Sequence, residues 1–103
     1  MYRLVLVTVA DKKEARNIAK VLVNNKLAAC VNIIGGAESF FRWKGKVDSA
    51  KEALLIIKSK KDKLSKIIKL VKSIHSYEIP EIISIPVTTG FKPYLKWIDE
   101  SLR

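Results

Sequence analysis

The order of the hydrophobic segments constrains the fold of this chain most strongly. Aliphatic, β-branched stretches typical of strands alternate with stretches that have the apolar spacing of amphipathic helices. This order, βαββαβ, with right-handed crossovers and one layer of helices, predicts an α+β, ferredoxin-like sandwich with the second and fourth strands at the sheet edges. The predicted strands are Tyr2 to Val9, Leu27 to Arg42, Val47 to Ser59 and Ile82 to Thr88.

Two helices are predicted between these strands. Asp11 and Glu14 have the spacing of a helix-start capping box, and the first helix is expected from about Lys12 to Asn25. The apolar positions repeat at helical spacing in both segments. The expected buried stripes are Ala15, Ile18, Ala19 and Leu22 in the first helix, and Leu64, Ile67, Ile68, Val71 and Ile74 in the second.

The second and third strands are expected to form one long hairpin. Gly35 and Gly36 interrupt the second strand and indicate a bulge or bend, and the segment from Lys44 to Lys46 supplies the reversal. Pro86 cannot donate a ladder hydrogen bond and so favours a sheet edge for the last strand. A short C-terminal helix should follow Pro93, with Tyr94, Trp97 and Ile98 on one face.

Length and composition favour one domain over residues 1–103. The apolar runs are strand-sized, far below the roughly 20 residues that a membrane-spanning helix needs, and the N-terminus lacks the pattern of a signal peptide. We therefore expect a cytoplasmic protein without a membrane partner. The single cysteine, Cys30, excludes an internal disulfide and fits a reducing compartment.

A formal net charge of +10 makes anions and nucleic acids partners to consider. Most lysines of the second helix fall outside its apolar stripe, which is more typical of a solvated face than of a binding patch. The predicted central strands, Leu4 to Val9 and Leu54 to Ile57, carry no aromatic side chain on which bases could stack. Specific nucleic-acid binding is thus not expected, and only nonspecific, salt-sensitive binding stays open.

The densest group of reactive side chains lies between His75 and Pro80. The only histidine falls near the end of the second helix, Tyr77 and Glu78 follow it within three residues, and Pro80 prevents the helix from continuing. These residues are expected to form a polar pocket wall. The alternative is structural, because a histidine at a helix C-terminus can complement the helix dipole while its neighbours close a loop.

Cys30 is a second candidate. Strand alternation places it on one face with Ala28 and Asn32, where it is either a small apolar filler or a soft metal ligand. Cys30 and His75 provide only two strong ligands, fewer than the four of a structural zinc site. Any metal site should therefore be weak or built from more than one chain. A glycine-rich phosphate loop and a nucleophile beside a base are both missing, so we do not expect an enzyme.

Motifs spread over almost the whole chain resemble those of the CutA1 family, the divalent-cation tolerance proteins. They are Ala28 to Ile33, Ser39 to Lys46, Glu52 with Leu55 to Lys58, His75 to Pro80, and Tyr94 to Trp97. The resemblance implies a ferredoxin-like homotrimer, tolerance to copper and other divalent cations, and no established enzymatic reaction. The residues that it implies are Cys30, His75 and Glu78 for metal, and Tyr77, Glu52 and Trp43 for a cleft.

The chain departs from the family pattern at two positions. Ser76 and Gly35 stand where the family usually has proline, and both changes are expected to loosen the backbone near the cleft. The exposed edge strand ending in Phe40, Phe41 and Trp43 should also need a covering partner.

The favoured interpretation is a cytoplasmic, non-enzymatic homotrimer that requires no cofactor and binds copper or another divalent cation weakly. The alternatives are a PII-like trimer that senses a small molecule in its intersubunit clefts, and a nonspecific nucleic-acid binder.

Overall fold

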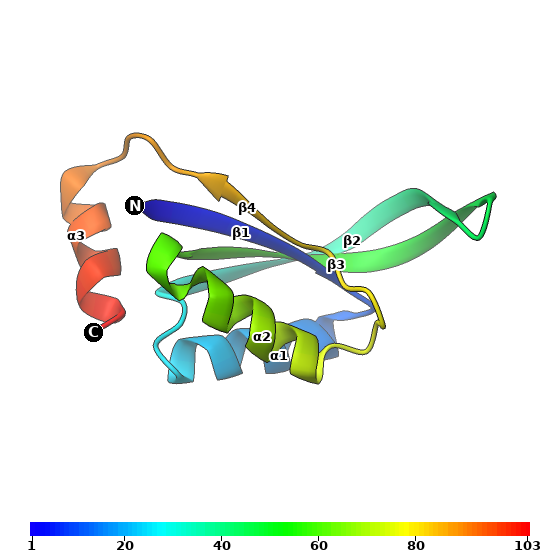
Figure 1. Cartoon of the computed structure of the whole chain (residues 1–103), viewed down its shortest axis with the longest axis horizontal. Helices are drawn as coiled ribbons and strands as arrows, with labels where there is room; N and C mark the ends of the chain where they lie inside the picture. Colours follow the sequence, from blue (N-terminus) through cyan, green and yellow to red (C-terminus); the bar gives the residue numbers. More distant parts are fainter.

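Four antiparallel strands form one sheet in the order β2-β3-β1-β4 (Figure 1). The computed structural model describes all 103 residues. The strands are β1 (Tyr2–Val9), β2 (Cys30–Trp43), β3 (Lys46–Lys60) and β4 (Ile82–Pro86). The predicted α+β ferredoxin-like order is confirmed, with β2 and β4 at the edges and Pro86 at the end of an edge strand.

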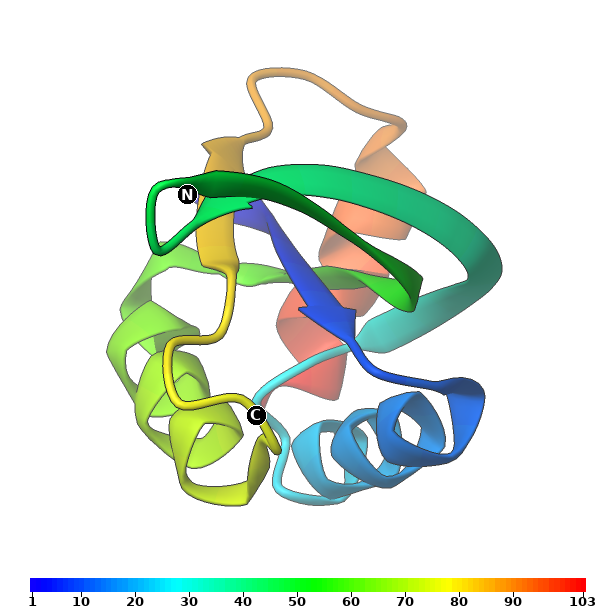
Figure 2. The same cartoon turned by 90° about the vertical axis from the view of Figure 1, so that its right-hand side faces the viewer.

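Helices α1 (Lys12–Asn24) and α2 (Leu64–Ile74) lie side by side on one face of the sheet, and a 3-10 turn, η1 (Lys61–Lys63), leads into α2 (Figure 2). β2 begins three residues later than predicted. Lys26 adopts a φ of 56°, and the N–H groups of Leu27 and Ala28 donate to the carbonyl of Leu22. These residues therefore close α1 before the strand begins.

The core lies between this helical layer and the sheet. Its fully buried side chains come from alternate positions of β1 and β3 and from one stripe on each helix: Val5, Val7, Val9, Leu55, Ile57, Ala15, Ile18, Leu22, Ile67 and Val71. Ile68, predicted to be buried, is 39% exposed. Neighbouring helix residues are about 100° apart, and because Ile67 and Val71 face the sheet, Ile68 points to the side.

The β2–β3 hairpin extends well beyond the helices (Figure 1). Its register shifts between Ile34 and Ala37, at the two glycines where a bulge was predicted, and Gly36 has a φ of +75°. Pairing then continues to Trp43 and Lys46. Lys44 and Gly45 both have positive φ, as a two-residue hairpin turn requires. We use "hairpin arm" below for residues 37–52.

Helix α3 (Lys92–Ser101) lies at the opposite end of the molecule from the arm (Figure 1). Ile98 and Leu102 pack against Ala29, and Asp99 accepts a hydrogen bond from the Tyr2 hydroxyl at 2.6 Å. Asp99 also pairs with Lys60 at 2.7 Å. Tyr94 and Trp97, predicted to share a face with buried Ile98, remain 41% and 44% exposed.

The other face of the sheet lies away from α1 and α2 (Figure 2), and α3 contacts it at the end that carries Tyr2 and Lys60. Strand alternation places Leu4 and Leu6 on this face, and Ile34, Ile83 and Ile85 lie there between 44% and 52% exposed. We call it the outer sheet face. No helix in the structure combines the length and the apolar character that a membrane crossing requires.

Candidate functional site

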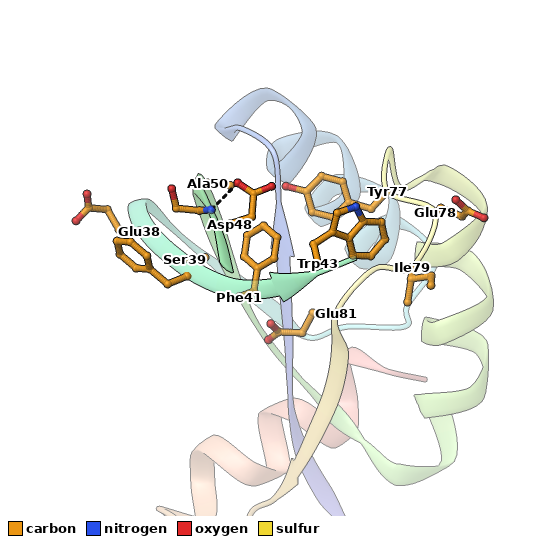
Figure 3. Close-up of a pocket in the computed structure, with 12 residues that line it drawn as sticks. Glu38, Ser39, Phe41, Trp43, Asp48, Ala50, Tyr77, Glu78, Ile79 and Glu81 are labelled. Atoms are coloured by element: carbon orange, nitrogen blue, oxygen red, sulfur yellow. Dashed lines mark hydrogen bonds between the residues drawn. The ribbon is translucent and has the colours of Figure 1, made fainter. Parts of the chain in front are cut away.

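A groove of about 880 Å³ lies between the hairpin arm and the loop that follows α2 (Figure 3). The arm contributes residues from both of its strands, and the loop contributes Tyr77 to Ile79 and Glu81. The lining residues on the arm are Glu38, Ser39, Phe40, Phe41, Trp43, Asp48, Ser49 and Ala50. The predicted cleft residues Trp43 and Tyr77, far apart in the sequence, thus line one groove together with Glu78.

His75 fixes the start of the loop wall. It caps α2 in an extended conformation, and its side chain is fully buried. Nε2 lies 2.8 Å from the carbonyl oxygen of Thr8, so Nε2 carries the proton and donates. Nδ1 accepts the backbone N–H of Tyr77 at 3.0 Å. Both ring nitrogens are therefore occupied within the chain, and His75 holds the loop against the end of β1.

Ser76 adds a second anchor. Its backbone N–H and its hydroxyl donate to the two carboxylate oxygens of Glu14, at 2.7 and 2.8 Å. The predicted capping residue Asp11 accepts the N–H of Glu14 at 2.8 Å. The Glu14 carboxylate also accepts the N–H of Ala10 at 3.4 Å, so it links the start of α1 to the loop. The two bonds that Ser76 donates oppose the expected loosening, because proline has no N–H to donate and serine provides two donors here.

Gly35, the other departure, lies beneath the side chain of Lys12. A Cβ atom at this position would overlap Lys12 Cε. Glycine therefore gives the Lys12 side chain room to cross the bulge.

Tyr77 and Glu52 form the base of the wall. The Tyr77 hydroxyl donates to Glu52 Oε2 at 2.8 Å, and Glu52 is only 8% exposed. Burial, followed by this hydrogen bond to a carboxylate, raises the pKa of Tyr77 to about 12. Tyr77 is therefore a neutral donor to a buried carboxylate at any physiological pH.

Cys30 lies elsewhere. It pairs with Lys58 on the outer sheet face, where Lys58 Nζ lies 3.9 Å from its sulfur and also contacts Asn32. Lys58 of β3 is paired with Cys30 on one side and with Leu4 of β1 on the other, so Cys30 lies at the level of Leu4. His75 is hydrogen-bonded to Thr8 of the same strand β1. Four residues separate these levels, which is roughly 13 Å along a strand.

The proposed metal ligands are therefore not assembled within one chain. No three His, Cys, Asp or Glu side chains are arranged to hold a metal ion. Glu78 lines the groove, His75 lies behind it with both nitrogens bonded, and Cys30 is at the far end of the sheet. The assignment of Cys30, His75 and Glu78 to a metal remains a prediction that requires ligands from a further chain.

Sequence reasoning missed most of the groove. Glu38, Asp48 and Glu81 line it and were not singled out, and Phe41 was expected only at an edge that needs a covering partner. The available signal was the hairpin register, since Phe41 is paired with Asp48 directly across the arm. Such cross-strand partners share a face and can be derived once the turn at Lys44 is located.

The sandwich, the long arm and the groove define an α+β protein of the ferredoxin-like class. The family model described as CutA1 divalent ion tolerance protein matches residues 3–101, and the chain belongs to this family. This assignment supports a divalent-cation tolerance protein rather than the PII-like sensor or the nucleic-acid binder.

Individual relatives agree with the family assignment. The chain is 43% identical to the divalent-cation tolerance protein CutA of Thermus thermophilus, over 98% of each chain. It is also 43% identical to the chloroplastic protein CutA of Arabidopsis thaliana, over 97% of this chain but only 55% of the plant protein. The chain thus spans about half the length of that relative.

The solved structures of relatives have the same fold. The Archaeoglobus fulgidus structure, titled a periplasmic divalent cation tolerance protein CutA, superposes with a TM-score of 0.98 at 42% identity over 100% of both chains. CutA1 from Oryza sativa gives a TM-score of 0.96 at 41% identity, over 99% of this chain and 94% of that one.

Proposed function

We propose that this protein acts in divalent-cation tolerance as a non-enzymatic homotrimer that binds divalent cations weakly and needs no resident cofactor. The observation that carries the proposal is the charge of the groove in a family named for cation tolerance. Four carboxylates line it, from Glu38, Asp48, Glu78 and Glu81, although the chain as a whole has a formal charge of +10. Such a local reversal of charge concentrates cations at one place.

The candidate ligands differ in the metals that they prefer. Carboxylate oxygens, such as those of Glu78, suit magnesium and manganese, whereas thiolate and imidazole suit copper. Binding through Glu78 alone should therefore discriminate poorly among cations. A copper preference that is lost in Cys30→Ser or His75→Ala would assign that ligand to the site. A site that uses both residues requires a second chain, because they lie far apart in one chain.

Titration calorimetry with copper and with magnesium tests the assignment. The proteins are the wild type, Glu78→Gln, His75→Ala and Cys30→Ser, with the exposed Glu100→Gln on α3 as the matched control. We expect tighter binding of copper than of magnesium, weaker copper binding in all three site variants, and no change in the control. Equal copper affinity in the wild type and His75→Ala would remove His75 from the site. Circular dichroism of His75→Ala checks the fold, because His75 is buried.

Assembly is supported by two uncovered surfaces. The outer sheet face exposes aliphatic side chains, and the edge strand β2 ends in Phe40, Phe41 and Trp43, which are 74%, 40% and 48% exposed. A second copy of the chain can cover both, and a head-to-tail contact closes into a ring when the rotation fits. The number three follows from the family resemblance. Light scattering should give about three times 11.6 kDa, and a mass near 11.6 kDa at micromolar concentration would contradict the trimer.

The cytoplasmic location remains a prediction. Among the relatives, the Arabidopsis protein is named chloroplastic and the Archaeoglobus protein is titled periplasmic. Fractionation of the native host would decide it.

A further inference from the structure

The hairpin arm is joined to the sandwich at a bulge. β1 pairs with β3 only as far as Ala53, so no third strand lies beside the arm. At the same level on β2, the register shifts at Gly35 and Gly36. Two adjacent glycines have few steric limits on their backbone angles, and a bulge bends its strand. The base of the arm is therefore a point at which the arm can change direction.

One side-chain hydrogen bond crosses this point. The Tyr77 hydroxyl donates to Glu52 Oε2, at the base of the arm, over 2.8 Å. Among the side-chain hydrogen bonds and ion pairs of the structure, it alone joins the arm to a residue outside β2 and β3. The direction of the arm thus depends on this bond and on the bulge.

Tyr77 belongs to the sandwich side of the bond. His75 accepts the backbone N–H of Tyr77 and is bonded through its other ring nitrogen to Thr8 of β1. Ser76, directly before Tyr77, donates two hydrogen bonds to Glu14 of α1. These contacts tie the loop to a strand and to a helix of the sandwich. The Tyr77 hydroxyl is therefore presented to the arm from a fixed position.

Burial makes this single bond important. Glu52 is 8% exposed, and no basic side chain pairs with it. A hydrogen bond in a poorly solvated position is stronger than one in water, and a buried carboxylate that loses its donor is costly. Without the Tyr77 hydroxyl, Glu52 regains solvation when the arm turns away from the loop.

We propose that Tyr77 and Glu52 form a latch that fixes the direction of the hairpin arm relative to the sandwich, with Gly35 and Gly36 as the hinge. The arm is one wall of the groove and the loop with Tyr77 is the other, so the latch also sets the width of the groove. Tyr77 is a positioning residue in this role. The role does not depend on metal binding and goes beyond the proposed cation tolerance.

Distances between two spin labels on the full chain test the latch. The labels are attached at Lys46→Cys near the tip of the arm and at Lys20→Cys on α1, both exposed positions, in a Cys30→Ser background. Labelled chains are refolded with an excess of unlabelled chains, so that an assembly contains one labelled chain. Pulsed electron paramagnetic resonance should give one narrow distance distribution with the latch intact. Tyr77→Phe should widen it about twofold, because the arm then moves about the hinge.

Three further variants separate the latch from a general loss of structure. Glu52→Gln keeps an acceptor oxygen for Tyr77 and should keep the narrow distribution. Tyr94→Phe removes a tyrosine hydroxyl from α3, at the other end of the molecule, and should change nothing (Figure 1). Gly35→Pro fixes a backbone angle of the hinge and should restore the narrow distribution in the Tyr77→Phe background. The long side chain of Lys12, which lies over Gly35, has the freedom to move aside.

Two results would overturn the proposal. The first is a distribution in Tyr77→Phe as narrow as in the wild type, and the second is equal widening by Tyr77→Phe and Tyr94→Phe. Circular dichroism and light scattering accompany each distance measurement. If Tyr77→Phe also changes the mass, the stiffened hinge still decides. Recovery of both the mass and the narrow distribution by Gly35→Pro supports the latch, and recovery of neither contradicts it.

Discussion

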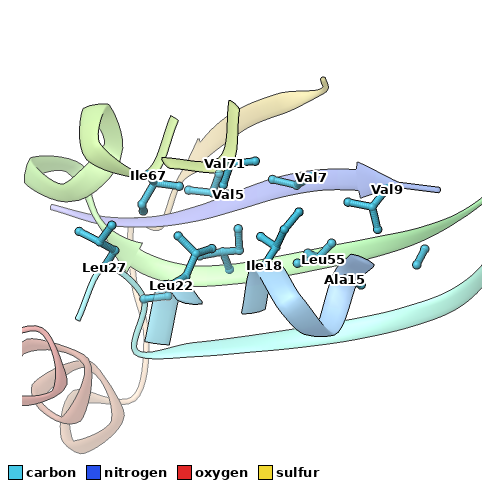
Figure 4. Close-up of a cluster of buried hydrophobic side chains, with 13 residues drawn as sticks. Val5, Val7, Val9, Ala15, Ile18, Leu22, Leu27, Leu55, Ile67 and Val71 are labelled. Carbon is cyan, nitrogen blue, oxygen red and sulfur yellow. The ribbon is translucent and has the colours of Figure 1, made fainter. Parts of the chain in front are cut away.

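The two halves of the sheet differ in whether helices cover them. In the sandwich half, β1 and the second part of β3 are covered by α1 and α2, and side chains such as Val7, Ile18 and Leu55 are fully buried (Figure 4). In the hairpin arm, no helix covers either face, and every residue from Phe40 to Ser49 is exposed. Yet the arm carries two of the chain's three phenylalanines and one of its two tryptophans.

This contrast separates what makes the chain fold from what makes it bind. A two-stranded hairpin is marginal alone in water, so the sandwich half must provide the stability that holds the arm. The arm lengthens the molecule to 45 Å against 25 and 23 Å in the other directions, and its aromatic and acidic side chains are exposed. Substitutions in the sandwich half should therefore lower stability, and substitutions in the arm should change assembly or binding.

The largest effect is expected on assembly. Trp43→Glu places a charge on the exposed aromatic end of the arm and should shift the proposed trimer to smaller or aggregated species, seen by light scattering. The matched control is Val23→Glu, which places the same charge at a 43% exposed position on the helical face and should leave the mass unchanged. If both variants keep the wild-type mass, the arm is not part of the interface.

A pair of neighbouring isoleucines tests the sandwich half. Ile67 is fully buried and Ile68 is 39% exposed on the same helix. Ile67→Ala should lower the free energy of unfolding by about 2–5 kcal/mol through lost burial and a cavity, and Ile68→Ala by less than about half of that. Urea unfolding at one fixed protein concentration measures both. Equal losses would mean that another chain covers Ile68.

The junction between the halves should depend on pH. The pKa of Tyr77 is raised from 10.0 to about 12, so the native state holds this proton more tightly than the unfolded state does. The resulting stabilisation is fully present below pH 10 and is lost as pH rises from 10 to 12. Tyr77→Phe should remove this part of the alkaline decline and, at neutral pH, cost about 1–3 kcal/mol by leaving buried Glu52 without its donor. Thermal unfolding of both proteins across this range would show parallel curves if Tyr77 did not contribute.

The smallest effect is expected at the loop anchor. Ser76→Ala removes the hydroxyl bond to Glu14 but keeps the backbone one, and should cost about 0.5–1 kcal/mol because the contact is solvent-exposed. Ser73→Ala is the control, since that hydroxyl bonds only within its own helix, to Leu70. Chemical denaturation compares the two. A cost for Ser76→Ala no greater than that for Ser73→Ala would show that the anchor does not hold the loop.

Much of the fold could be predicted from the sequence because the evidence for it is local. The strand of β1 and the N-terminus of α1 follow from alternation and from the capping residue Asp11, and the turn at Lys44 follows from the glycine beside it. The family motifs, spread from Ala28 to Trp97, pointed to the same fold independently. The error at Ile68 arose because helical periodicity gives a stripe but not its width, which depends on what packs against it.

The sequence by itself thus determined the order of elements, the edge strands and the family, since these depend on neighbours along the chain and on recurring motifs. Only the tertiary structure decided which polar residues meet. In the folded chain both ring nitrogens of His75 are hydrogen-bonded, and Cys30 lies at the far end of the sheet. Glu81 lines the same groove as Asp48 and Phe41. The reason is that a side chain's partners depend on strand register and on loop anchors such as Ser76 with Glu14, which join residues 62 positions apart.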